Sequence, residues 1–310
     1  MAKRSHVPVL ITWDVDPDRW TTIERRRLAL RMAMDLCQEF DVRSTFFVTA
    51  RYAPEYPDEF QRMQALDQEI GCHGLTHDDD EEYDRMPEAT QRVYIEDATG
   101  ELEAVIGGPV RAFRSPRVKI SSTTLQLLAE RGYLADSSIC SGRLDVLSSN
   151  LINTGWLVAP RRPYYPHHAH PFKRGDLSVL EVPVSALAVP FISKALNALG
   201  LPAMKALFRL LYAESRHTGK PIVYMSHPTE FILAKGAGER HALRRLLSPS
   251  FFSLRRIRTH GFLIRNALLR MCGETLFHNS RQLFAYMASF PDVSFMTMSE
   301  YAGHNLADAT

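Results

Sequence analysis

Short apolar segments of strand type alternate with amphipathic segments of helix type through the first part of the chain. The strand-like runs end in polar residues and occupy residues 7–13, 42–50, 69–72, 110–113 and 133–136. The helix-like segments between them occupy residues 22–40, 60–67, 89–106 and 122–131. Because repeated β–α units bury their strands between helices, this order favours a parallel α/β barrel or a doubly wound sheet.

The size of the chain indicates one core. With 310 residues, of which 45% are hydrophobic, it is long enough to bury a single large core. We therefore expect one domain over residues 1–310, with a loop insertion at 140–175 and helical or basic insertions at 186–215 and 236–275. The formal net charge of +2 gives no reason to expect a nucleic-acid partner.

The chain shows no sign of export. Its basic N-terminal residues have no signal-type apolar core, and no run of about 18 apolar residues follows. The four cysteines lie far apart in apolar or motif stretches, which favours reduced thiols over a disulfide framework; they are Cys37, Cys72, Cys140 and Cys272. These features predict a cytoplasmic protein.

Two histidines in the segment His73-Gly74-Leu75-Thr76-His77 have the spacing of metal ligands. If the segment forms one helical turn, side chains at positions i and i+4 face the same side and can reach one ion. The alternative is a pair of ordinary polar histidines.

Two aspartates follow the apolar run at residues 7–13. The carboxyl ends of parallel strands are where α/β folds place their chemistry, so Asp14 and Asp16 are candidates for a functional site. One of them can bind a metal while the other stays beside it as a base. The alternative is an Asp-x-Asp-Pro turn that only ends the strand.

Five motifs, in this order, resemble those of the polysaccharide deacetylase family, which has the NodB homology domain. They are Thr-Trp-Asp-Val-Asp, Ser-Thr-Phe-Phe-Val, Glu-Ile-Gly-Cys-His-Gly-Leu-Thr-His, Phe-Arg-Ser-Pro-Arg and Tyr-Met-Ser-His-Pro. The resemblance covers roughly residues 7–140 and resumes at 176–231. It implies a distorted (β/α) barrel of the NodB-like type, here with a helical insertion, and metal-dependent hydrolysis of an N-acyl amino sugar.

The resemblance implies that Asp16, His73 and His77 form a metal triad, usually of zinc. Two histidines and one carboxylate leave a coordination position for a water whose pKa falls towards neutrality. Asp14 matches the general base that accepts a proton from this water. Arg114 matches the arginine that holds the base, since a guanidinium suits a carboxylate and keeps it ionised.

Three further roles follow from the same resemblance. His227, after the strand-like residues 221–225, matches the general acid that protonates the departing amine. Asp136 fits a carboxylate that orients a catalytic histidine, although a turn aspartate would look the same. Arg117 occupies the position whose backbone N–H stabilises the oxyanion; the family often has an aromatic side chain there, so a role for the arginine side chain is open.

The insertion at 140–175 contains too many prolines around residues 160–171 for a helix or an inner strand. Loops of this length are usually functional, and Arg162 and Tyr165 are candidates for substrate contact. The acidic run at residues 78–82 is expected to be a solvated loop rather than a second metal site.

Two later segments bear on partners. Residues 190–212 have the pattern of a helical hairpin broken at 200–202. Residues 240–270 contain eight arginines and no acid, interleaved with large apolar side chains. This segment is either a pair of helices with a basic outer face or a peripheral surface for an anionic membrane.

These observations predict a hydrolase dependent on Zn²⁺ or another divalent metal. It would remove an acetyl or formyl group from an amino sugar in cytoplasmic saccharide or lipid-linked sugar biosynthesis, with a free, phosphorylated or lipid-linked substrate. In the lipid-linked version the chain would contact the inner membrane face. The alternatives are an amidase acting on a non-sugar C–N bond of the ureide type and a catalytically inactive carbohydrate-binding protein.

Overall fold

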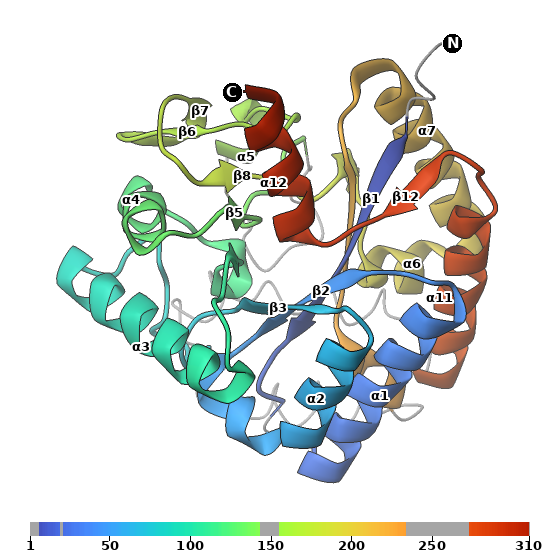
Figure 1. Cartoon of the computed structure of the whole chain (residues 1–310). Coiled ribbons are helices and arrows are strands. Elements are labelled where there is room, and N and C mark those ends of the chain that lie inside the picture. The colour runs from blue at the N-terminus through green and yellow to red at the C-terminus, as the bar shows by residue number, and fades with distance from the viewer. Residues whose placement is uncertain (1–5, 19–20, 143–154, 234–272, 310) are drawn as a thin grey trace, which may run out of the picture.

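The computed structural model describes residues 6–18, 21–142, 155–233 and 273–309, with side chains to residue 304. Its centre is a curled parallel sheet with the strand order β11-β1-β2-β3-β4-β5-β8, and β12 pairs with the start of β1 (Figure 1). The strands are β1 (Val7–Val15), β2 (Ser44–Val48), β3 (Glu69–Cys72), β4 (Ala112–Phe113), β5 (Ala135–Asp136), β8 (Leu180–Glu181), β11 (Ile222–Ser226) and β12 (Val293–Phe295). The backbone N–H of Ser185 donates to the Val223 carbonyl, so the segment after β8 reaches β11 and the sheet curls towards a barrel.

Helices connect the strands and cover the outside of the sheet (Figure 1). They are α1 (Ile23–Glu39), α2 (Pro57–Ala65), α3 (Glu88–Ile106), α4 (Ser122–Arg131), α6 (Ser193–Leu199), α7 (Leu201–Thr218), α11 (Gly273–Ala288) and α12 (Met298–Ala309). Three short 3₁₀ helices follow strands: η1 (Ala50–Glu55), η2 (Pro116–Val118) and η3 (Pro228–Ile232). This arrangement is the distorted (β/α) barrel that the resemblance implied.

The central strands are almost completely buried, which explains why their sequences are nearly continuous apolar runs. Trp13 in β1 is fully buried and stacks on Phe46 of β2 with ring centroids 5.9 Å apart. Its indole N–H donates to Ser44 Oγ, so the one polar atom of the ring is satisfied. This packing holds β1, the strand that carries Asp14 and is followed directly by Asp16, against its neighbours.

Several helix boundaries follow from local sequence. Thr22 caps α1 by accepting a hydrogen bond from the Arg25 N–H. Ser121 and Thr124 form a reciprocal capping box at the start of α4, which ends at Gly132 with a left-handed φ of 86°. The helix predicted at residues 122–131 is confirmed.

The insertions differ in part from the predictions. The 140–175 region contains a short helix, α5 (Gly155–Val158), and an antiparallel hairpin of β6 (Pro166–His167) and β7 (His170–Arg174), so it is not a simple loop. A small hairpin of β9 (Ala186–Leu187) and β10 (Val189–Pro190) precedes the predicted pair α6 and α7, which break at Gly200. Most of the basic insertion 236–275, including residues 240–270, lies outside the described residues.

The two ends of the undescribed stretch 234–272 meet at one place. The backbone N–H of Gly273 donates to the Leu233 carbonyl at 2.8 Å. A Cβ atom added to Gly273 would lie only 2.1 Å from the Phe231 carbonyl oxygen, so this close approach requires glycine. The junction lies directly after η3, at the carboxyl end of β11.

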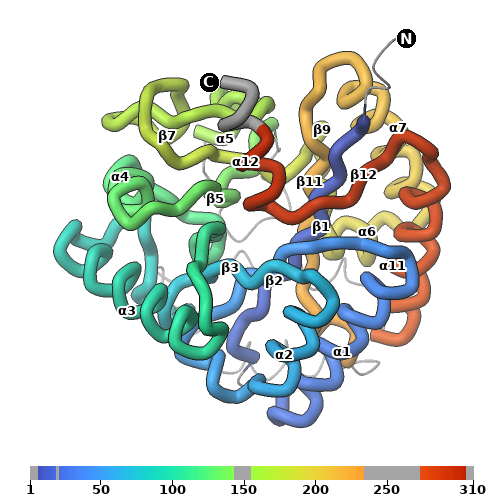
Figure 2. The backbone as a smooth tube through the Cα atoms, in the orientation of Figure 1, coloured from blue at the N-terminus to red at the C-terminus, as the bar shows by residue number. Residues whose placement is uncertain are grey.

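The last helix, α12, was not predicted. Figure 2 shows it crossing near β5, and the backbone N–H groups at its start donate to Thr45 Oγ1 and Glu69 Oε2 at the amino ends of β2 and β3. It therefore covers the end of the sheet opposite the candidate site.

None of the described helices combines the length and apolar character needed to cross a bilayer. Of the four cysteines, Cys37, Cys72 and Cys140 are buried and belong to no disulfide among the described residues, and Cys272 lies outside those residues.

Candidate active site and metal centre

The residues singled out by the sequence come from the carboxyl ends of strands in one parallel sheet. Asp14 lies near the end of β1 and Asp16 directly follows that strand. His73 follows β3, Arg114 follows β4 and His227 follows β11. Because these strands run parallel in one sheet, their carboxyl ends open on the same side of the barrel.

Asp16, His73 and His77 form the one group among the described residues whose ligand atoms lie close enough together to hold a metal ion. The Nε2 atoms of His73 and His77 lie 3.2 Å and 3.5 Å from Asp16 Oδ1. All three ligand atoms lie within 4.8 Å of one another. A carboxylate with two imidazoles is a donor set that suits Zn²⁺ and other divalent transition metals.

Two details of this cluster fit a bound cation. Asp16 Oδ1 is buried and makes no hydrogen bond among the described residues, which is costly for a carboxylate oxygen unless a cation neutralises it. The His73 ring donates from Nδ1 to the Arg114 carbonyl at 2.7 Å. This hydrogen bond fixes the tautomer and turns Nε2 towards Asp16, as ligating histidines require.

The electrostatics of the cluster also favour positive charge. Burial by itself raises the pKa of Asp16, but His77 and His227 outweigh it and lower that pKa well below its ordinary value. Burial lowers the pKa of His77, which favours the neutral imidazole that a metal ligand needs. Burial acts on His73 in the same direction, yet the carboxylates of Asp14 and Asp16 raise its pKa. Two carboxylates therefore stabilise a positive charge at this point.

Asp14 is buried beside the cluster and is ion-paired with Arg114, whose Nη1 lies 2.7 Å from Asp14 Oδ1. The same nitrogen donates to Thr12 Oγ1, while Nε and Nη2 donate to the carbonyl and hydroxyl oxygens of Ser137, each at 2.8 Å. Burial would raise the pKa of Asp14, but the charge of Arg114, followed by those of nearby imidazoles, lowers it. Asp14 is thus an ionised carboxylate held in one orientation.

The segment from His73 to His77 does not form the helical turn that the spacing suggested. It is an irregular loop in which Gly74 and His77 both have a left-handed φ, 76° and 57°. The carboxylate of Glu81 accepts hydrogen bonds from the backbone N–H groups of this loop. Glu81 is fully buried and Glu82 nearly so, whereas Asp79 and Asp80 are exposed, so the prediction of a solvated loop at residues 78–82 is wrong for its last two acids.

His227 Nε2 lies 3.5 Å from Asp16 Oδ2, so the ring stands beside the cluster. Its Nδ1 lies 3.4 Å from Oε1 of Glu230, a carboxylate that is 12% exposed and lies three residues further along in η3. Asp136, predicted to orient a catalytic histidine, accepts a hydrogen bond from Ser138. The carboxylate at the Nδ1 side of His227 is therefore Glu230, and the orienting role of Asp136 stays a prediction.

Arg117 lies in η2 with a left-handed φ of 58°. Its side chain is directed to the His77 loop, where Nη2 donates to the carbonyls of His77 and Asp78 at 3.2 Å and 3.0 Å. Nη1 reaches the Glu81 carbonyl at 3.4 Å. The arginine side chain thus contacts the loop that carries a candidate ligand, while the backbone role of Arg117 stays a prediction.

The two candidates for substrate contact lie just before β6. Arg162 is exposed, and the neighbouring Arg161 forms an ion pair with Glu214 at 2.8 Å. Tyr165 Oη is buried without a hydrogen-bond partner among the described residues. No contact found in the described part of the chain joins Arg162 or Tyr165 to the Asp16 cluster, so their roles also stay predictions.

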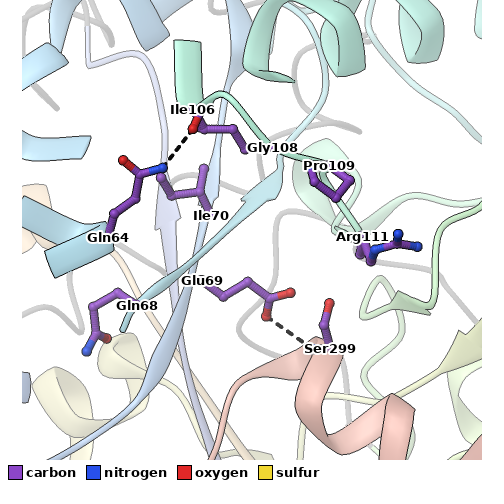
Figure 3. Close-up of a pocket in the computed structure, with 9 residues that line it drawn as sticks. All are labelled: Gln64, Gln68, Glu69, Ile70, Ile106, Gly108, Pro109, Arg111 and Ser299. Carbon is purple, nitrogen blue, oxygen red and sulfur yellow. Dashed lines mark hydrogen bonds between the residues drawn. The ribbon is translucent and has the colours of Figure 1, made fainter. Parts of the chain in front are cut away.

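A separate cavity of about 280 Å³ lies at the opposite end of the sheet (Figure 3). Glu69, the first residue of β3, and Arg111, just before β4, line it together with Ser299 of α12. These residues belong to the amino ends of the strands. The cavity is therefore distinct from the candidate active site.

Sequence reasoning missed Glu81 and Glu230. Glu230 follows His227 at a spacing of three residues, with a proline between them that starts a short helix, and this spacing could have indicated a partner for the ring. Glu81 is one of five consecutive acids, and the sequence carries no mark that distinguishes the buried one.

The comparisons with known proteins agree with the fold. Two solved structures described as polysaccharide deacetylases align with almost the whole chain. The one from Mycobacterium smegmatis has a TM-score of 0.65 and 20% identity over 100% of this chain and 93% of that chain. The one from Pseudomonas aeruginosa PAO1 has a TM-score of 0.59 and 14% identity over 97% and 91%.

A solved PuuE allantoinase aligns similarly, with a TM-score of 0.62 and 15% identity over 99% of this chain and 92% of that one. At these identities the likeness concerns the fold.

No curated protein sequence gives a significant match. The family model for polysaccharide deacetylase matches residues 2–135, which include Asp14, Asp16, both histidines of the cluster and Arg114. The match to the polysaccharide deacetylase family therefore concerns residues 2–135, which hold most of the candidate site.

Proposed function

We propose that this chain is a metal-dependent hydrolase that removes an N-acetyl or N-formyl group from an amino sugar. The observation that carries the proposal is the convergence of three kinds of group at one end of the sheet. These are a three-residue metal-ligand cluster, an ionised carboxylate held by a buried arginine, and an imidazole with its own carboxylate partner. Each is a part that hydrolysis of an amide requires.

A divalent cation held by Asp16, His73 and His77 would supply Lewis acidity, which makes water more acidic and the acyl carbonyl more electrophilic. Asp14 accepts the proton of the attacking water, since it is ionised, buried and fixed by Arg114. His227 donates a proton to the departing amine, because an amine leaves poorly as its anion. Its position beside Asp16 places it at the same end of the sheet as the base.

The first experiment measures metal and turnover together. The purified chain would be loaded with Zn²⁺ or Co²⁺ and incubated with acylated nucleotide sugars and lipid-linked sugars, and released acetate or formate would be measured. We expect about one metal per chain and product release that stops with a chelator. Replacement of Asp16, His73 or His77 by alanine should weaken metal binding at least about tenfold. Full metal occupancy and activity in any of these variants would contradict the assigned triad.

A second candidate substrate is a non-sugar C–N bond of the ureide type. It is favoured by the whole-chain similarity to a structure named as an allantoinase. The same assay can include a cyclic ureide and follow ring opening. Turnover of the ureide without release of acid from any sugar would favour this candidate, whereas metal binding without turnover of either class would favour a binding protein.

The basic segment bears on where the substrate is found. Residues 240–270 carry eight arginines and no acid, which suits an anionic membrane surface or a lipid diphosphate. We expect the chain to sediment with liposomes that contain anionic lipid, less so as salt rises, because salt screens exposed charges. Replacing Arg255, Arg256 and Arg258 by glutamine should weaken sedimentation and leave hydrolysis of a small soluble substrate intact. Failure to sediment at low salt would leave a basic segment that serves an anionic soluble substrate.

A further inference from the structure

The loop that carries His77 is organised by a carboxylate that does not belong to the ligand cluster. Glu81 Oε2 accepts from the backbone N–H groups of Thr76 at 2.7 Å and His77 at 2.5 Å, and from Thr76 Oγ1 at 3.0 Å. Glu81 Oε1 accepts from the Leu75 N–H at 2.7 Å and from the Tyr83 hydroxyl at 3.0 Å. Three successive backbone N–H groups therefore converge on one side chain.

This arrangement takes the place of the hydrogen bonds that a helix or strand would supply. Buried backbone N–H groups need acceptors, and the loop from 73 to 77 is neither helical nor extended. Successive N–H groups that point to one side form an anion-binding concavity, and in this chain Glu81 fills it. Because Glu81 is fully buried, water does not compete for these bonds.

Arg117 binds the backbone carbonyl groups of the same loop. Its guanidinium donates to the carbonyls of His77, Asp78 and Glu81, and the side chain is only 10% exposed. Glu81 thus holds the N–H groups of the loop and Arg117 holds its carbonyls. The two residues fix the backbone on both sides of His77, which has a left-handed φ of 57°.

The loop is closely packed at Gly74. A Cβ atom added to Gly74 would lie 2.4 Å from Glu81 Oε1 and 2.7 Å from Pro116 Cγ. Gly74 also has a left-handed φ of 76°, which glycine adopts without strain. The loop therefore fits closely around the Glu81 carboxylate, and the direction of the His77 ring depends on that fit.

We propose that Glu81, together with Arg117, is a positioning residue that holds His77 in the orientation needed to bind the metal. This inference rests on the proposed metal-dependent function. Groups outside the ligand set that orient a ligand typically change metal affinity about 10- to 100-fold when they are removed. Glu81 and Arg117 act through the backbone of the loop, whereas His73 is oriented by its own ring hydrogen bond.

The chain offers a matched control in the adjacent residue. Glu82 is also buried, but its carboxylate pairs with Lys119 and Arg85 rather than with the loop N–H groups. Replacing Glu82 by glutamine removes a buried charge next to the loop without removing an acceptor from it. A general loss of stability would therefore affect Glu82→Gln as well as the Glu81 variants.

The test measures binding of Co²⁺ to the metal-free protein by competition with a chromophoric chelator, with the visible absorption of bound Co²⁺ as a second readout. We expect Glu81→Ala to weaken Co²⁺ about 10- to 100-fold and to change the Co²⁺ spectrum, with a smaller loss for Glu81→Gln, which keeps one acceptor oxygen. Arg117→Ala should weaken Co²⁺ in the same direction. Glu82→Gln should keep the wild-type affinity and spectrum.

Three results of this Co²⁺ titration would overturn the positioning role of Glu81. Equal Co²⁺ affinity in wild type and Glu81→Gln or Glu81→Ala would overturn the positioning role and leave the proposed function in place. An equal loss in Glu82→Gln would also overturn it, because the effect would then be general. Absence of Co²⁺ binding to the wild type would overturn both. If Glu81→Ala does not fold, Glu81→Gln and Arg117→Ala still give the comparison.

Discussion

At the scale of single residues, the site is defined by how the charge of Asp14 is controlled. Burial opposes the ionised form, and the Arg114 guanidinium at 2.7 Å restores it. Arg114 is itself buried, and its N–H groups are satisfied by Thr12 and Ser137 as well as by Asp14. Removing either partner would leave an uncompensated charge in the interior.

Asp14→Asn keeps the shape of the side chain but removes the proton acceptor. We expect turnover to fall by about two to four orders of magnitude, with metal content close to that of the wild type. Metal analysis of the purified protein and single-turnover kinetics check the two halves of this prediction. A variant that loses metal and activity together would instead make Asp14 part of the ligand set.

At the scale of elements, β3 shows how closely the strands pack. A Cβ atom added to Gly71 would lie 2.8 Å from Phe47 Cδ1 and 2.9 Å from the Ala112 carbonyl oxygen. The first contact is to a buried ring and the second to the backbone just before Phe113 in β4. Neither neighbour can move without disturbing the sheet.

Gly71→Ala should therefore lower the free energy of unfolding by about 1–3 kcal/mol, the usual cost of overfilling a packed site. Gly100→Ala is the matched control, because Gly100 lies within α3 with no atom within 4 Å of an added Cβ. Alanine there should stabilise the chain by about 0.5–1 kcal/mol. Urea unfolding monitored by circular dichroism measures both, and a Gly71 variant as stable as the wild type would contradict the packing argument.

The bounds of several strands and helices could be predicted from the sequence because the residues that set them lie within or next to each element. The strand at 69–72 and the helix at 122–131 have the predicted bounds, since apolar runs, a capping box and a terminal glycine mark them. The helical turn at His73–His77 was wrong because the i,i+4 spacing also fits an irregular loop. The loop conformation depends on Glu81, whose burial is a tertiary property that an acidic run does not reveal. Likewise, Glu230 lies at Nδ1 of His227 because η3 directly follows β11, a tertiary arrangement that the sequence does not mark.

At the scale of the whole molecule, a buried pair of acids makes stability depend on pH. Asp136 and Glu181 are register partners on β5 and β8 and are both fully buried. Burial, followed by the neighbouring Asp136 carboxyl, raises the pKa of Glu181 well above its ordinary value of 4.5. Glu181 is therefore protonated in the folded chain at pH values where the unfolded chain has already lost that proton.

Because the folded-state pKa is the higher one, the stability due to this proton is fully present below the unfolded pKa and is lost as pH rises through the folded pKa. Glu181→Gln keeps a neutral side chain and removes the titration. The wild-type free energy of unfolding minus that of the variant should fall as pH rises above about 4.5, by at most about 1.4 kcal/mol per pH unit. Urea unfolding of both proteins across that range checks the slope, and a constant difference would show that Glu181 is ionised when folded.

The hydrogen bond between Gly273 and Leu233 has a consequence for how such a chain can change over evolutionary time. Leu233 and Gly273, the described residues on either side of 234–272, lie next to each other directly after η3, the helix that carries Glu230. An exchange of this stretch for another of different length or charge leaves the pairing of every described strand intact. Selection can therefore change the sequence between residues 233 and 273 while the strand ends that hold the candidate site are inherited unaltered.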